Sequence, residues 1–320
     1  MGRWISFRVA ALVGAVALSA CSGAEQAQGE LGSDQETEEL GTAEQAILDG
    51  APADDTKYDA IGALVWYLPD LGVFEVFCSG TLVGHQAVVT ARHCTPSIDL
   101  ALENGIIPAF AIGPNAFEPT QLIPITSYVT APPSPDGEGL LLDGGRDVAV
   151  AYLESEPEDV CPAKLGRFEK NMLGKKFQIA GYGVYDFDGI YGHRYAGKVT
   201  ARALAGRWYP LLFNGSYRDY HDWYFSDSST PLATEEEARE WWKIYKLEKN
   251  YELLAGGLPG ESIGCYGDSG GPLLLGKHSR NLTTYGVSFA VEGTLSTICG
   301  LGGGYLVFNR EMLDFVKDAL

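Results

Sequence analysis

Three segments far apart in the chain carry side chains whose types together suit nucleophilic catalysis. Ser269 lies in the run Gly-Asp-Ser-Gly-Gly-Pro at residues 267–272, where backbone N–H groups between glycines can approach an oxyanion. His93 ends an apolar run just before Cys94, and Asp147 precedes an alternating Val-Ala-Val-Ala stretch. An alcohol is a poor nucleophile at neutral pH, so it needs a base, and the base needs a carboxylate that orients it. These residue types predict acyl transfer through a serine nucleophile.

The order of these residues along the chain, histidine then aspartate then serine, restricts the fold. In an α/β-hydrolase the acid and the histidine follow the serine. The only histidine after Ser269 is His278, and no acid lies between the two, so that fold is excluded. Asp143 is an alternative to Asp147, but only Asp147 directly precedes the alternating stretch.

Short apolar segments between Gly-rich turns must position these side chains, and their pattern is typical of an all-β fold. A C-terminal helix is predicted over residues 310–320. The predicted strands span residues 61–68, 73–82, 87–91, 148–153, 177–182, 198–204, 285–291 and 305–309.

With the motifs in this order, the chain resembles the chymotrypsin-like serine proteases over most of residues 47–320. The resemblance implies two six-stranded antiparallel β-barrels, with His93 as base, Asp147 as its orienting acid and Ser269 as nucleophile. It also implies that the backbone N–H groups of Gly267 and Ser269 bind the oxyanion. The expected activity is serine endopeptidase action on polypeptides. The resemblance rests on residues 78–82, 90–94, 147–149, 181–183, 267–272 and 286–289.

The same resemblance implies where substrate specificity is decided. Ile263 matches the floor of the specificity pocket, and Ser288, Phe289 and Ala290 match its wall. Ile263 offers no carboxylate to a Lys or Arg side chain, and Ala290 stands where the family often has glycine, which narrows the entrance. We therefore expect cleavage after small or medium apolar residues rather than after Arg or Lys.

The beginning of the chain predicts a targeting segment over residues 1–20. Basic residues precede an apolar stretch at residues 9–18 that is too short to span a membrane. The run Leu-Ser-Ala-Cys at residues 18–21 resembles a bacterial lipobox, which implies a lipid on Cys21 as the only contact with a membrane. We expect a cell-envelope lipoprotein, in the outer membrane, or a released extracellular form. The alternative is an ordinary secretory signal with an incidental cysteine.

Residues 21–46 predict an acidic tether, because the segment has too few large apolar groups to fold. The junction between Ala46 and Ile47 resembles the family's activation site. Cleavage there would free an amino terminus at Ile47 that pairs with the acid before the nucleophile, Asp268. It would also separate the catalytic domain, residues 47–320, from its lipid. The alternative is that Ile47 simply begins the first strand of an uncleaved protein.

The six cysteines favour an oxidising compartment. Matching family positions imply disulfides between Cys78 and Cys94 and between Cys265 and Cys299. Once Cys21 carries a lipid, Cys161 has no partner left, and we expect a free buried thiol.

Residues 206–260 form an insertion that is longer than the family core requires. Thr234 and Glu237 have the spacing of a capping box, and Trp241 and Trp242 follow at helical spacing, so a helix is predicted. The two tryptophans pack in a core or, alternatively, form an exosite.

The formal net charge of −19 excludes nucleic acid as a partner. No Cys/His or Asp/Glu spacing indicates a metal site, and no cofactor is expected. We expect a monomer that acts on polypeptides. Two alternatives stay open: a catalytically silent homologue that serves as a surface binding protein, and a preference for ester substrates, which the same chemistry permits.

Overall fold

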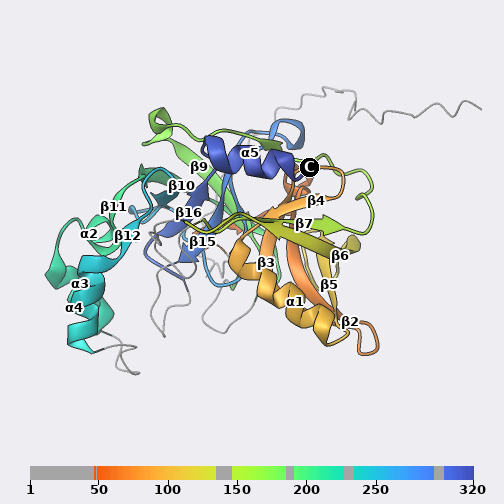
Figure 1. The fold of residues 1–320 in the computed structure, drawn as a ribbon, viewed down its shortest axis with the longest axis horizontal. Coiled ribbons are helices and arrows are strands. Elements are labelled where there is room, and N and C mark those ends of the chain that lie inside the picture. Colours follow the sequence, from red (N-terminus) through yellow and green to blue (C-terminus); the bar gives the residue numbers. More distant parts are fainter. Residues whose placement is uncertain (1–46, 48, 135–145, 185–190, 227–233, 292–298) are drawn as a thin grey trace, which may run out of the picture. The chain divides into compact units, whose positions relative to one another are not determined.

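The described residues of the computed structural model, 47, 49–134, 146–184, 191–226, 234–291 and 299–320, build two antiparallel β-barrels (Figure 1). The first barrel closes in the order β2-β3-β4-β7-β6-β5. Its strands are β2 (Ile61–Leu68), β3 (Val73–Leu82), β4 (Ala87–Thr90), β5 (Ile107–Ile112), β6 (Gln121–Thr130) and β7 (Ala149–Leu153).

The second barrel closes because β9 and β10 pair directly, with Ala196 opposite Ala180. Its order is β10-β13-β16-β15-β14-β9. The short β1 (Ala51–Pro52) extends this sheet beside β10, and β8 (Lys164–Leu165) runs parallel to β15. The barrel strands are β9 (Lys176–Gly181), β10 (Tyr195–Ala203), β13 (Glu252–Ala255), β14 (Pro272–Leu275), β15 (Thr283–Val291) and β16 (Gly303–Val307). The prediction of an all-β fold with two six-stranded barrels is confirmed.

Each barrel has an apolar interior. Leu64, Val88 and Phe110 are fully buried in the first barrel, and Phe177 and Leu253 are fully buried in the second. Burying a side chain of this size contributes about 1.5–3 kcal/mol relative to leaving it in water. The cores therefore fix the strands from which the loops of the site emerge.

Two prolines explain why β5 and β6 were missing from the predicted strands. Pro108 lies inside β5 and Pro124 inside β6, and proline within an apolar run argues against a strand. The barrel nevertheless pairs the two strands, with Ala109 opposite Pro124. The strands β13 and β14, of four residues each, were also not predicted, because such short apolar runs lack a clear period.

Buried polar side chains tie the barrels together. The hydroxyl of Tyr182, which follows β9, lies 3.0 Å from the carbonyl oxygen of Ile61 and 2.5 Å from that of Gly113, both in the first barrel. Burial raises the pKa of Tyr182 to about 12, so the hydroxyl stays protonated and can donate. The fully buried Arg194 donates from Nε to the carbonyl oxygen of Ala53 at 2.8 Å. These bonds hold the second barrel and the N-terminal segment against the first.

The predicted C-terminal helix is α5 (Arg310–Asp318), and α1 (Thr95–Glu103) follows the histidine segment. Short 3-10 turns occupy η1 (Thr56–Tyr58), η2 (Arg92–Cys94), η3 (Lys170–Met172) and η4 (Ser279–Asn281). None of the helices in the described part of the chain is long and apolar enough to cross a membrane.

The insertion contains α2 (Trp208–Leu212), α3 (Tyr217–Tyr224) and α4 (Glu235–Ile244), and the pair β11 (Gly206–Arg207) and β12 (Lys246–Leu247) closes its base (Figure 1). The predicted capping box is present, since the N–H of Glu237 donates to Thr234 Oγ1 and the Glu237 carboxylate accepts from the N–H of Thr234. The ring of Trp242 lies 5.2 Å from that of the fully buried Tyr220. Trp241 and Trp242 thus pack against an aromatic core.

Candidate active site

Strand pairing in the first barrel brings His93 and Asp147 together. Thr90, at the end of β4, lies opposite Ala149, at the start of β7. His93 follows the first of these strands in η2, and Asp147 precedes the second, so both emerge at the same end of the pair. The distance from His93 Nδ1 to Asp147 Oδ2 is 2.5 Å, and the backbone N–H of His93 donates to Asp147 Oδ1 at 2.7 Å. The carboxylate thus fixes the imidazole with a proton on Nδ1, which leaves Nε2 to accept one.

A tight turn presents the Asp147 carboxylate. The N–H of Val148 donates to the carbonyl oxygen of Arg146 at 3.0 Å, across Asp147. The Arg146 guanidinium lies 4.3 Å from the centre of the Tyr251 ring, and its Nε is 3.6 Å from Glu248 Oε1. Tyr251 and Glu248 belong to the segment that returns from the insertion, so the insertion packs beside the turn of the acid. Asp143, the alternative acid, lies outside the described residues.

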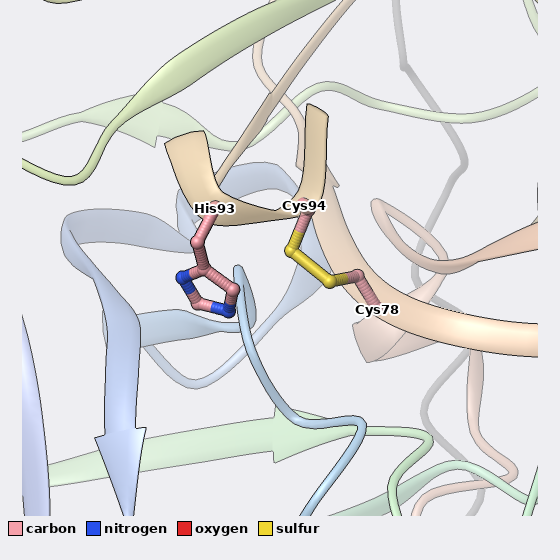
Figure 2. Close-up of side chains that lie close together, drawn as sticks. All are labelled: Cys78, His93 and Cys94. Atoms are coloured by element: carbon pink, nitrogen blue, oxygen red, sulfur yellow. A yellow bond between two sulfur atoms is a disulfide. The ribbon is translucent and has the colours of Figure 1, made fainter. Parts of the chain in front are cut away.

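The backbone of Ser269 lies against the segment that carries His93. Its carbonyl oxygen accepts the N–H of Ser79 at 2.8 Å and lies 3.9 Å from Cys94 Sγ. Figure 2 shows the His93 ring beside the disulfide between Cys94 and Cys78. The approach is so close that a Cβ on Gly270, whose φ is +80°, would lie 2.1 Å from the Thr90 hydroxyl. Glycine is therefore required after Ser269.

The predicted oxyanion donors, Gly267 and Ser269, lie in the same loop. No described residue accepts a hydrogen bond from the backbone N–H of either one. Gly267 has a φ of +95°, and a Cβ there would lie 2.8 Å from Gly183 Cα. The two amides are therefore available to a bound oxygen, in a backbone conformation that only glycine adopts readily.

Asp268 is buried between them and points away from solvent. Its Oδ1 accepts the N–H of Gly183 at 2.9 Å, and its Oδ2 accepts the N–H of Cys265 at 2.8 Å. Burial raises the pKa of Asp268 from 3.8 to about 7, although both hydrogen bonds act to lower it. A buried carboxylate of this kind gains from a nearby cation.

Ile47 is buried in the core of the second barrel with Phe177 and Leu253, and the N–H of Gly50 donates to its carbonyl oxygen at 2.6 Å. Two residues further, the carbonyl oxygen of Asp49 accepts from Ser262 Oγ at 2.9 Å. Ala46 lies outside the described residues, as do the predicted signal segment and tether.

Three of the four predicted pocket residues, Ser288, Phe289 and Ala290, lie on β15. Ser288 exchanges two backbone hydrogen bonds with the loop of Ser269, to Gly271 at 2.8 Å and from Gly270 at 2.7 Å. Phe289 is only 3% exposed and belongs to the same apolar cluster as Trp208 of the insertion. Ala290 lies opposite Gly304 on β16, and Ile263 is half-buried two residues before Cys265.

The structure contains both predicted disulfides, Cys78–Cys94 and Cys265–Cys299. The prediction of a free thiol at Cys161 is wrong, because Cys161 is disulfide-bonded and no described cysteine is free. The other described cysteines pair with one another, so its partner lies outside the described residues.

One group of donor atoms has the proximity of a metal site. Side-chain atoms of Cys78, His93 and Cys94 lie within 4.8 Å of one another. The two sulfurs are bonded to each other in a disulfide (Figure 2). Nδ1 of His93 is hydrogen-bonded to Asp147, so this nitrogen and both sulfurs are already engaged. We assign no metal to them.

Sequence reasoning missed a cavity of about 270 Å³ beside Gly267. Four of its nine lining residues are aromatic, and the hydroxyl of Tyr191 donates to the carboxylate of Glu75 at 3.0 Å. Sequence reasoning also missed the contacts of Ser79 with the loop of Ser269 and those of Arg146 with Glu248 and Tyr251. The motif at residues 78–82 contains Ser79, but nothing in its spacing announces a contact with a loop almost two hundred residues away. The cavity is lined by Glu75, Val76, Phe77, Tyr182, Gly183, Val184, Tyr191, Tyr266 and Gly267.

His93 thus contacts Asp147, and the backbone of Ser269 lies against the segment that carries His93. The amides of Gly267 and Ser269 have no acceptor among the described residues. Residues 50–204 match the family model described as Trypsin. The chain is also 25% identical over 269 residues to melanization protease 1 of Drosophila melanogaster. That alignment covers 78% of this chain and 58% of the relative, so the chain spans less than two thirds of the relative's length.

The raised pKa of Asp268 predicts a pH-dependent stability of the uncut chain. The folded state binds this proton more tightly than the unfolded state, so the contribution of Asp268 is full below pH 4 and is lost as the pH rises through about 7. Asp268→Asn does not titrate at this position. Between pH 4 and 7.5, the free energy of unfolding of wild type should therefore fall by about 4 kcal/mol relative to that of Asp268→Asn, because one pKa unit corresponds to about 1.36 kcal/mol.

Urea denaturation over this pH range measures the difference. Asp314→Asn removes a carboxylate that is 60% exposed on α5 and serves as the matched control, for which we expect no such trend. A difference between wild type and Asp268→Asn that stays constant with pH would contradict the assignment.

Proposed function

We propose that this chain, a member of the trypsin family through residues 50–204, is a serine endopeptidase that hydrolyses peptide bonds. The observation that carries the proposal is the pair of hydrogen bonds from His93 to Asp147, on the segment against which the backbone of Ser269 lies. An imidazole held in this way is a general base for a neighbouring alcohol.

The proposed reaction proceeds in two halves. Ser269 Oγ attacks the peptide carbonyl carbon while His93 Nε2 takes the hydroxyl proton, and the N–H groups of Gly267 and Ser269 bind the oxyanion. The tetrahedral intermediate collapses, the C–N bond breaks, and His93 returns the proton to the leaving amine. Water then attacks the acyl-enzyme with His93 again as base, which releases the acid and restores Ser269.

The proposed substrates are polypeptides with a small or medium apolar residue before the cleaved bond. Three features support this preference: the apolar side chain of Ile263, the methyl side chain of Ala290 on β15, and the burial of Phe289 in an aromatic cluster. An apolar pocket floor leaves a Lys or Arg cation without a partner, which costs binding free energy.

Cleavage between Ala46 and Ile47 is the proposed activation step. No described residue forms an ion pair with the buried Asp268, and a new ammonium at Ile47 would supply a cation that lowers the pKa of Asp268. Burial of the Ile47 side chain in the second barrel supports a docked position for this terminus.

A lipid on Cys21 is the proposed anchor of the uncut chain, and cleavage after Ala46 would release the catalytic domain. The Cys21 sulfur can carry a thioether-linked lipid or enter a disulfide, but not both. Cys161 has a disulfide partner outside the described residues, and Cys21 is the one remaining cysteine of the sequence. The mass of the N-terminal peptide therefore decides whether the anchor exists.

Replacing Ser269 tests the activity. Ser269→Ala should lower turnover of a peptide substrate by roughly a millionfold, and Asp147→Asn by roughly ten-thousandfold, because the latter disturbs the tautomer of His93. A fluorophosphonate probe should label wild type and not Ser269→Ala, whereas Ser226→Ala, at an exposed serine, should label normally. Absence of labelling in wild type both before and after cleavage at residue 46 would favour the silent homologue that binds without catalysis.

Replacing the pocket floor tests the specificity. Wild type and Ile263→Val should both prefer Ala, Val or Leu before the cleaved bond. Ile263→Asp should shift the ratio of kcat/KM toward Arg and Lys substrates by roughly tenfold or more, because the carboxylate pairs with the cation in a poorly solvated site. Peptide substrates that differ only at this residue provide the measurement. A wild type that prefers Arg or Lys overturns the assignment of Ile263.

Mass spectrometry of fractionated cells tests activation and anchoring together. We expect a soluble, probe-reactive species that begins at Ile47, and an uncut membrane species that carries a lipid mass on Cys21. Cys21→Ser should move the uncut chain to the soluble fraction. An active enzyme that always retains residues 22–46 contradicts the activation step, and a Cys21–Cys161 disulfide in the uncut chain contradicts the anchor.

A further inference from the structure

Ser79 of β3 contacts the nucleophile loop at two points. Its backbone N–H donates to the carbonyl oxygen of Ser269 at 2.8 Å, and its side-chain Oγ donates to the carbonyl oxygen of Gly267 at 2.9 Å. Ser79 is fully buried. One residue of the first barrel therefore holds the carbonyl groups of the residues before and after Asp268, in a loop of the second barrel.

The Ser79 hydroxyl is fixed by a second bond, because it accepts the backbone N–H of Tyr182 at 3.1 Å. Its proton must then point toward the carbonyl oxygen of Gly267. The carbonyl oxygen of Ser79 accepts the Thr90 hydroxyl at 2.9 Å, three residues before His93. A continuous chain of hydrogen bonds thus connects the strand of the base to the loop of the nucleophile.

The surroundings of this hydroxyl are close-packed. A Cβ on Gly181 would lie 3.2 Å from Ser79 Oγ and 2.2 Å from Asp268 Oδ1. Removal of a single oxygen atom leaves less space than a water molecule requires, so no solvent takes the place of the hydroxyl. The carbonyl oxygen of Gly267 would lose this donor.

We propose that Ser79 is a positioning residue. Its hydroxyl holds the carbonyl group of Gly267 so that the backbone N–H groups of Gly267 and Ser269 face the oxyanion. The proposal rests on the proposed hydrolase function. Gly267 has no side chain to restrain its backbone, and its φ of +95° is one of several conformations open to glycine. The bond from Ser79 selects one of them from outside the loop.

Ser79→Ala tests the proposal in the full chain. We expect kcat for a peptide substrate to fall about tenfold with KM changed less than twofold, because the oxyanion bond strengthens in the transition state. Affinity for a peptide aldehyde, whose adduct places an oxyanion in the same site, should fall by a similar factor. Affinity for the same peptide ending in a carboxamide should not change.

Thr81→Val is the matched control. Thr81 lies two residues along the same strand and is fully buried, and no described residue forms a hydrogen bond with its hydroxyl. The substitution removes a buried hydroxyl and nearly conserves volume. We expect wild-type kcat and aldehyde affinity. An equal loss in Thr81→Val, or a change in KM alone for Ser79→Ala, would overturn the proposal.

Amide hydrogen exchange tests the same contact without activity. In a Ser269→Ala background, Ser79→Ala should raise exchange of the hydrogen-bonded loop amides about tenfold while both barrel cores stay protected. These amides belong to Cys265, Asp268, Gly270 and Gly271. Loss of protection throughout both barrels would mean that Ser79 serves stability alone, which overturns the proposal. Unchanged exchange of the loop amides would also overturn it. Failure of the probe to label wild type would refute the hydrolase function, whereas exchange reports on the Ser79 contact in either case.

Discussion

The register between the two barrels is the constraint on which the site depends. His93 and Asp147 belong to the first barrel, whereas Ser269 belongs to a loop of the second, so no local structure holds the proposed base near the proposed nucleophile. Backbone and hydroxyl bonds from Ser79 to the loop set this register, and the buried hydroxyl of Tyr182 supports it. A small slip between the barrels would separate an alcohol from its base, and acyl transfer requires them within hydrogen-bond reach.

The burial of Asp268 makes its ionised form costly at the contact between the two barrels. Two backbone N–H groups hold its carboxylate, yet burial raises its pKa to about 7, so the uncut chain carries an acid that ionises only at a cost. The Cys265–Cys299 disulfide and the glycines around the loop keep the carboxylate in place despite this cost. Proteins tolerate such a buried group where a partner charge or a functional geometry compensates for it. Here the same loop presents the amides of Gly267 and Ser269.

The insertion packs against the barrels and shares a hydrophobic cluster with them. Its aromatic residues share a cluster with Phe289 on β15, and the segment after β12 brings Glu248 and Tyr251 to Arg146, next to Asp147. Helix α4 could be predicted because a capping box is a local pattern. Its partners could not, since they depend on where the barrel strands place Phe289 and Arg146.

The sequence by itself determined the residue types and order of the proposed triad, the barrel class, the C-terminal helix and the two disulfides, because each has a short pattern or a matching family motif. Tertiary structure alone decided the pairing of proline-containing strands, the bonded state of Cys161, the raised pKa of Asp268 and the contacts of Ser79. These depend on burial and on groups that are distant along the chain. A local pattern records which atoms a segment offers, whereas dielectric surroundings and hydrogen-bond partners arise only when the barrels close.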